Sequence, residues 1–178
     1  MKRLIELLVA LFVVLAATGA SGVDKTWIGT SPQWDKAANW SPFGIPATTD
    51  NVIIPVSSTY PTISSVTVNN LTINENAYVV VKGDLTVTGI ATIAGTLTDQ
   101  GNFVNFTFNT VIVTSTGRFE SSRRTDVVIL NGDSVIDGAF IQSQDARAYI
   151  NGDVTFSGTG TLQLGNITIA DGQTVVVD

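Results

Sequence analysis

The chain has 178 residues, with 9 Lys and Arg against 15 Asp and Glu, a formal net charge of −6 and a sequence pI near 4.4. Such an acidic chain lacks the basic surface that nucleic-acid binding requires. The absence of His and Cys removes the commonest general base, thiolate zinc sites, a Cys nucleophile and any disulfide framework. The length suits one compact domain, and abundant Thr, Val, Ile, Asn and Gly after residue 22 predict β-structure.

Residues 1–22 have the pattern of a secretory signal peptide. A basic start at residues 1–3 precedes an apolar stretch from Leu4 to Ala17, and small residues follow as far as Gly22. This pattern predicts cleavage after Ala20 or Gly22 and export from the cell. The apolar stretch is shorter than the roughly 20 residues that span a membrane comfortably.

Glu6 interrupts this apolar stretch, where a carboxylate is uncommon. The string from Leu4 to Leu11, Leu-Ile-Glu-Leu-Leu-Val-Ala-Leu, resembles the N-terminal helix of type IV pilins. That resemblance implies a retained helix that packs in a filament core. The chain departs from the pilin pattern because no Gly-Phe-Thr precedes the string and Glu6 lies one place late if Met1 is the mature start. Residues 1–22 are therefore predicted to be a cleaved signal peptide or a retained apolar helix, and only the latter would contact a membrane.

Residues 23–65, the Trp/Pro segment, contain all three Trp and all five Pro residues of the chain. Residues that precede proline favour extended or turn backbone, so a long helix is excluded here. Three indole rings must bury a large apolar area, and a stack of coils needs a cap at its end. We therefore predict that Trp27, Trp34 and Trp40 cap the N-terminal end of the coils that follow.

Several strings in this segment resemble one that is common at the start of secreted bacterial parallel β-helix proteins, among them autotransporter-passenger-like and other surface adhesins. They are Trp34, Asn39-Trp40-Ser41, Gly44-Ile45-Pro46 and the run from Asp50 to Pro55. The resemblance extends over about residues 27–98. It implies a secreted, repetitive β-helix that acts as a surface or structural module, and it brings no catalytic residues with it.

Residues 66–178 repeat one pattern, in which a short apolar-and-threonine strand is followed by a Gly/Asn/Asp turn. The turns recur as Lys82-Gly83-Asp84, Asn131-Gly132-Asp133 and Asn151-Gly152-Asp153. Self-similarity at about 20 residues predicts a β-solenoid, whose coils bury their apolar faces only by stacking. We predict an all-β, single-stranded parallel β-helix of about six coils. The predicted coils are residues 66–83, 84–102, 103–124, 125–146, 147–165 and 166–178.

Strand alternation predicts which side chains point into the coils. Val79-Val80-Val81 and Val111-Ile112-Val113 resist this alternation, so we expect either a scattered exposed valine or a face that another subunit covers. The residues predicted to point inward are Leu85, Val87, Val104, Phe106, Phe108, Val154, Phe156, Leu162 and Leu164.

The densest charge cluster contains Glu120, Arg123, Arg124 and Asp126. Polysaccharide lyases of the parallel β-helix type use a basic side chain and carboxylate-bound calcium, and this cluster could imitate them. A solvated turn between two coils explains the same residues more simply. We therefore predict no catalytic residues and no enzyme activity.

Four aspartates beside glycine offer hard oxygen ligands of the kind that calcium takes. They are Asp133, Asp137, Asp153 and Asp171. The nonapeptide repeat of calcium-binding β-helices is missing, and Asp beside Gly is also the ordinary chemistry of a tight turn. We therefore predict no metal and no cofactor.

Four asparagines match the Asn-x-Ser/Thr pattern of glycan acceptors, and exposure on an exported protein would make them usable. They are Asn39, Asn70, Asn105 and Asn166.

The C-terminal strand consists of Thr174, Val175, Val176 and Val177, and no polar terminal coil follows it in the sequence. An open solenoid end shows unpaired backbone groups and bare core side chains. We predict that a second copy covers it head to tail, which makes the protein an extracellular or cell-surface structural subunit of a fibre or layer. The alternatives are an adhesin or carbohydrate-binding β-helix that contacts cell-surface glycans, and a polysaccharide-active enzyme.

Overall fold

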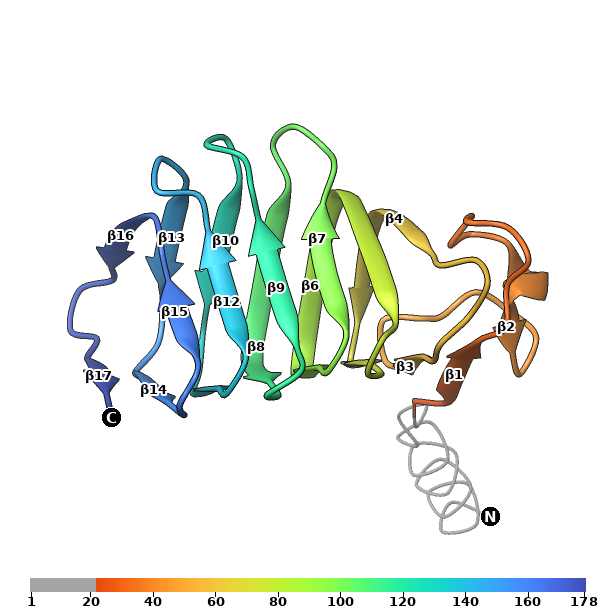
Figure 1. Cartoon of the computed structure of the whole chain (residues 1–178), viewed down its shortest axis with the longest axis horizontal. Coiled ribbons are helices and arrows are strands. Elements are labelled where there is room, and N and C mark those ends of the chain that lie inside the picture. The colour runs from red at the N-terminus through yellow and green to blue at the C-terminus, as the bar shows by residue number, and fades with distance from the viewer. Residues whose placement is uncertain (1–21) are drawn as a thin grey trace, which may run out of the picture.

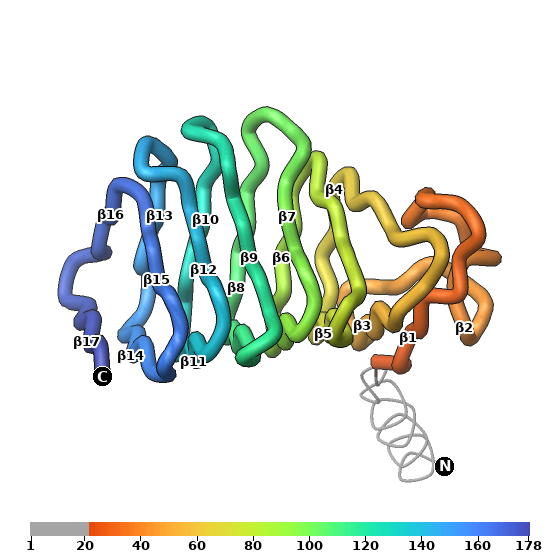
Figure 2. The backbone as a smooth tube through the Cα atoms, viewed as in Figure 1, coloured from red at the N-terminus to blue at the C-terminus, as the bar shows by residue number. Residues whose placement is uncertain are grey.

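The computed structural model describes residues 22–178, which form a β-solenoid of about six coils (Figures 1 and 2). The predicted all-β fold with parallel pairing between successive coils is confirmed. The described chain contains seventeen strands and a single three-residue 3-10 helix, η1 (Ala37–Asn39). No helix within residues 22–178 is long and apolar enough to cross a membrane. The predicted signal peptide or retained helix lies almost wholly outside the described residues.

The strands lie in three stacks along the solenoid axis, and long strands bend from one stack into the next. The first stack contains β4 (Thr62–Val68), β6 (Tyr78–Ile93), β7 (Thr96–Asp99), β9 (Arg118–Ser121), β12 (Ala139–Gln142) and β15 (Thr161–Gln163). The second contains β4, β6, β8 (Asn105–Val113), β10 (Val127–Leu130), β13 (Arg147–Ile150) and β16 (Asn166–Ile169). The third contains β1 (Asp24–Trp27), β3 (Asn51–Ile54), β5 (Asn70–Ile73), β6, β8, β11 (Ser134–Ile136), β14 (Val154–Ser157) and β17 (Val175–Val177).

The Trp/Pro segment contributes strands to the solenoid as well as loops. Its strands β1 and β3 begin the third stack, two strands before the first complete coil starts at Thr62. The short strand β2 (Trp40–Ser41) pairs with β1 and makes an antiparallel pairing, unlike the others in the described chain. Figure 1 shows the segment at the N-terminal end of the stack.

The coils differ in length because their corner loops differ. Strand partners lie 18 residues apart at Thr62 and Val80 but 23 apart at Val111 and Ser134. The complete coils begin at residues 62, 78, 96, 118, 139 and 161, out of phase with the predicted boundaries. The reason is that the repeated Gly-Asp turns lie at corners within coils and not between them.

The core is the apolar interior that the three stacks enclose. The side chains predicted to point inward are buried, except for Leu162 and Leu164 in the last coil, which are partly buried. Aromatic rings from successive coils are in contact inside: the Phe119 ring lies 4.9 Å from that of Phe106 and 4.3 Å from that of Phe140, centroid to centroid. Val80 is 9% exposed within this one chain, so a covering subunit is not needed to explain the valine triplet.

The repeated Gly-Asp turns join each coil to both of its neighbours. A Cβ at Gly83 or Gly152 would overlap a backbone carbonyl of the preceding coil, at Ser64 and Asn131 respectively. The following aspartate bonds forward: Asp133 Oδ1 accepts a hydrogen bond from the Thr155 N–H at 2.8 Å, one coil on. Asp153 does the same for Thr174, and Asp84 accepts from the Asn105 amide. The turn motif thus holds neighbouring coils together. Its glycine lets the backbone approach the preceding coil, and its aspartate accepts a hydrogen bond from the next coil.

Replacing Asp133 with Ala should lower the free energy of unfolding by about 0.5–1 kcal/mol, because the Thr155 N–H loses a charged acceptor at the protein surface. Asp171 is exposed, as Asp133 is, but accepts no hydrogen bond within residues 22–178, so Asp171→Ala is the matched control and should change stability by less than about 0.5 kcal/mol. Urea denaturation measures both, and equal effects would contradict the stacking role of Asp133.

Candidate binding surfaces

The three tryptophans form one buried cluster beside the first coil. Trp40 packs edge-on against Trp27 and Trp34, with ring centroids 5.0 and 4.6 Å away, and the exposed fractions are 1%, 5% and 1% for Trp27, Trp34 and Trp40. The indole N–H of Trp27 donates to the Thr59 carbonyl and that of Trp40 to the Trp34 carbonyl. The Trp34 N–H is buried without a partner in the described chain.

Polar side chains tie the loops of the Trp/Pro segment together. The Asn39 amide donates to the carbonyls of Ser31 and Gln33 at 2.9 and 2.7 Å. Asp50 accepts from the N–H groups of Val23 and Ala47. Burial opposes ionisation of Asp50, but these two donors and the Lys25 charge outweigh it and lower the pKa of the carboxyl.

The predicted glycan acceptors lie in different surroundings. Asn39 is 1% exposed and its amide is fully engaged, so the folded chain does not present it. Asn70 and Asn105 are half-buried and donate to side chains of the neighbouring coil, Asn51 and Asp84. Asn166 is exposed on the last coil. Glycosylation at the last three stays a prediction.

The charged residues between Glu120 and Asp126 are brought together only in part. Arg123 lies 3.5 Å from Asp99, whereas Glu120 pairs with Arg118 and Arg124 faces Asp145 at 3.9 Å. Asp126 is fully buried and accepts from the Val104 N–H at 3.0 Å.

Burial raises the pKa of the Asp126 carboxyl, and the Asp99 charge adds to the rise against the opposing N–H groups of Val104 and Arg123. Asp99 in turn accepts from the Ser122 N–H. Both carboxylates therefore hold backbone groups of the turn, as a structural corner requires.

The aspartates considered as calcium ligands do not converge on one point. Asp133 and Asp153 bond forward to the next coil, and Asp137 does so to the Thr159 N–H at 3.1 Å. Within residues 22–178 no group of three or more acidic side chains is placed to hold a metal ion.

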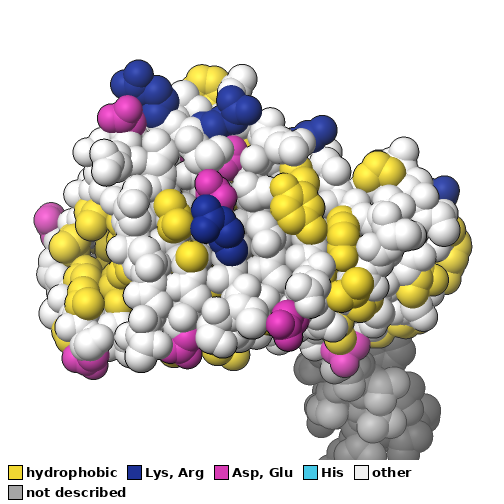
Figure 3. Space-filling view, in the orientation of Figure 1, with side chains coloured by type: hydrophobic (Ala, Val, Ile, Leu, Met, Phe, Trp, Pro, Cys, Tyr) yellow, Lys and Arg dark blue, Asp and Glu magenta, His cyan; other side chains and the backbone are white. Residues whose placement is uncertain are grey.

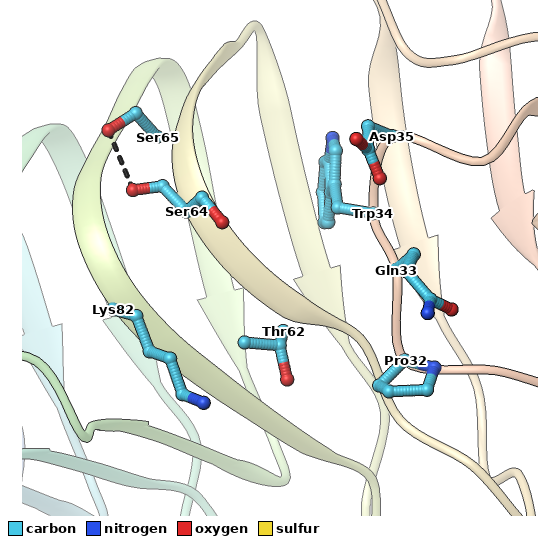
Figure 4. A pocket seen from close by; sticks show the side chains of 8 residues that line it. All are labelled: Pro32, Gln33, Trp34, Asp35, Thr62, Ser64, Ser65 and Lys82. Atoms are coloured by element: carbon cyan, nitrogen blue, oxygen red, sulfur yellow. Dashed lines mark hydrogen bonds between the residues drawn. The ribbon is translucent and has the colours of Figure 1, made fainter.

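A groove of about 680 Å³ lies between the Trp/Pro segment and the first coils (Figure 4). One wall comes from residues 32–35 and the other from β4 and the Lys82 turn of β6. The walls are joined at one edge, where the Thr62 N–H donates to the Pro32 carbonyl, and they separate beyond it. The lining residues are Pro32, Gln33, Trp34, Asp35, Thr62, Ser64, Ser65 and Lys82.

The opposite end of the solenoid is apolar and open, and we call it the C-terminal surface. Figure 3 shows hydrophobic side chains around a hollow at this end. The hollow has a volume of about 210 Å³. Ile167 and Val177 are 54% and 73% exposed, since no further coil within the described residues covers them. The residues around the hollow are Ile150, Phe156, Leu162, Leu164, Ile167, Ile169, Val175 and Val177.

The sequence predicted one of these surfaces and missed the other. Of the predicted self-association strand, Val176 and Val177 are exposed, Thr174 is exposed but its N–H is held by Asp153, and Val175 packs partly on the core. The groove carries no periodic signal because its residues come from three separate stretches of chain. Only Trp34 had been singled out, and for a different reason.

A family model described as Domain of unknown function (DUF8693) matches residues 26–132. The chain belongs to this family. The match covers the tryptophan cluster, both walls of the groove and the solenoid as far as β10. Comparisons with curated proteins and with solved structures find no match.

Proposed function

We propose that this member of the DUF8693 family is an extracellular structural subunit that associates end to end through its C-terminal surface. A β-solenoid fold suits a structural or adhesin-like role. The observation that carries the proposal is where the apolar exposure lies. Of thirteen exposed large hydrophobic residues in the described chain, four lie in the last coil and five in the Trp/Pro segment.

The two ends of one subunit supply unlike surfaces for such a contact. The last coil presents Ile167, Ile169 and Val177, and the Trp/Pro segment presents Ile28 and Phe43, of which Phe43 is 78% exposed. Burying apolar area of this kind gains about 25 cal/mol per Å². A contact between unlike ends does not close on itself unless the rotation forms a ring, so it propagates into a fibre. The partner is therefore a second copy of the chain.

We infer that the tryptophan cluster closes the N-terminal end of the core. It lies beside β1 and β2, beyond the first complete coil, and its rings are almost wholly buried. Terminal repeats of a solenoid need such a cover because the interior is otherwise exposed to water. The C-terminal surface has no such cover within residues 22–178.

Replacing Trp40 with Ala should lower the free energy of unfolding by roughly 3–5 kcal/mol, because a buried ring in contact with two others is lost. Phe103 is 70% exposed, so Phe103→Ala is a control with little expected effect. Unchanged urea stability of the Trp40 variant would show that the cluster does not close the core.

Assembly is tested with two variants, each of which places one negative charge at one end of the subunit. In light scattering and electron microscopy over a wide concentration range, the full chain should form growing assemblies, and Val177→Asp or Phe43→Asp should each stop growth. Mixing the two variants should give pairs that stop at two, because each supplies the end that the other has lost. Val135→Asp, at a site exposed to 36% in the middle of the solenoid, should leave assembly unchanged.

A chain that stays monomeric at high concentration would contradict the assembly proposal. Pairs formed by Phe43→Asp alone would also contradict it, because they would mean that two C-terminal surfaces bind each other.

We propose further that the protein is exported, with residues 1–22 as the signal. This rests on the basic, apolar and small-residue order of that segment. Mass spectrometry of the mature protein from its native source should find a first residue at Ser21 or Val23. A mature chain that begins at Met1 would favour the retained helix instead.

A further inference from the structure

The groove of Figure 4 gathers polar groups that have no partner. The side chains of Gln33, Asp35, Thr62, Ser64 and Lys82 make no hydrogen bond within the described chain, although all five line one hollow. Asp133, Asp137 and Asp153 of the turns are instead held by the neighbouring coil. Gln33, Asp35, Ser64 and Lys82 are exposed, so their donors and acceptors face water and are available to a ligand.

The Trp34 ring stands in this wall with an unsatisfied donor. Its exposed fraction is 5%, and its N–H has no acceptor among residues 22–178. The other two indoles of the cluster each find a carbonyl, at 2.7 and 2.8 Å. A buried donor without a partner costs about 1–3 kcal/mol. This N–H lies beneath the groove surface and out of reach of a bound molecule, so Trp34 contributes to the wall only through the small exposed part of the residue.

The chemistry of the lining selects the class of ligand. Donors come from Lys82 and Gln33, and acceptors from Asp35 and the hydroxyl groups, so the ligand must both donate and accept at several points. One carboxylate and one ammonium leave the groove without net charge. Hydroxyl groups on an uncharged ring meet these conditions.

Two other classes of ligand fit less well. Anions would meet Asp35 in the groove and a net charge of −6 on the chain. An extended peptide would have to pair with the edge of β4, but that strand carries a register shift between Ile63 and Ser65 beside the Lys82 turn. Bulges and lysines are devices that discourage strand addition.

We propose that the groove between residues 32–35 and residues 62–82 binds a short neutral saccharide. Gln33, Asp35 and Lys82 are all exposed in the groove and hydrogen-bond the hydroxyl groups of the saccharide, and the buried Trp34 lies in the wall behind them. The volume of about 680 Å³ lies in the range of roughly 300–1,000 Å³ of small-molecule sites. This site is separate from the C-terminal surface, so it does not depend on assembly. It would give the subunit a second function as a glycan-binding module.

The test follows the three indole N–H signals of the ¹⁵N-labelled full chain by NMR. Val177→Asp is included in every sample to keep the chain monomeric, and Trp34→Phe identifies the Trp34 signal by its loss. The probes are short oligomers of glucose, xylose and N-acetylglucosamine, with an oligouronide and an extended alternating apolar-polar peptide as comparators, each raised to millimolar concentration.

At least one neutral oligosaccharide should shift the Trp34 signal and leave those of Trp27 and Trp40 in place. Lys82→Ala should weaken that binding about tenfold, as expected for a lost hydrogen bond from a charged group. Lys36→Ala is the matched control, because Lys36 is exposed nearby but does not line the groove, and it should bind as the parent does. Trp34→Phe serves only to assign the signal, because a smaller ring in this buried cluster leaves a cavity beside Trp40 and lowers stability.

The proposal is overturned if no neutral oligosaccharide moves the Trp34 signal at millimolar concentration. It is also overturned if only the oligouronide or the peptide binds, or if Lys36→Ala weakens binding as much as Lys82→Ala.

Discussion

Parallel hydrogen bonding between successive coils is the constraint on which the rest of this structure depends. Each strand is too short to be stable alone, and its backbone groups find partners only in the coils before and after it. The interior is apolar because three such stacks face one another, and the phenylalanines of neighbouring coils meet inside it. The turn motifs serve the same constraint, with glycine permitting close approach on one side and aspartate bonding on the other.

This constraint also explains where the binding surfaces lie. Along the middle of the solenoid each coil is covered on both sides, and its polar groups are largely taken up by its neighbours. At the two ends of residues 22–178 a coil has a neighbour on one side only. The groove lies where the Trp/Pro segment diverges from β4, and the hollow lies over the last described coil. Both proposed binding surfaces therefore lie at the ends of the described repeat.

The fold could be predicted from the sequence because the repeat appears in short sequence patterns within each strand and turn. Alternation along β8 or β14 identifies inward residues such as Phe106 and Phe156, and the Gly-Asp turns reveal the period. The phase of the coils could not be predicted, because a turn at a corner and a turn between coils have the same composition. The coil starting at Thr62 has no such turn before it and is identified only by its pairing with Val80.

The two candidate sites differ in the same way, because one could be predicted from the sequence and the other could not. The apolar strand β17 could be predicted, since its three valines stand together in the sequence. The groove could not, because Asp35, Ser64 and Lys82 are brought together by stacking alone. The two aspartates Asp133 and Asp153 were interpreted only as turn formers, because a bond to a residue more than twenty positions ahead leaves no local signal.

The hydrogen bonds of Asp133 and Asp153 run forward along the chain, and this direction bears on the order in which the coils can form. Asp133 and Asp153 each accept a hydrogen bond from a backbone N–H that comes later in the chain. Strands β1 and β3 come first and provide the edge with which the first coil pairs. When a polypeptide emerges N-terminus first, from a ribosome or across a membrane, the coils already formed therefore provide the strands with which each new coil pairs. Nearest-neighbour contacts make such stepwise growth sufficient, so the chain can fold in the order in which it appears, without its far end.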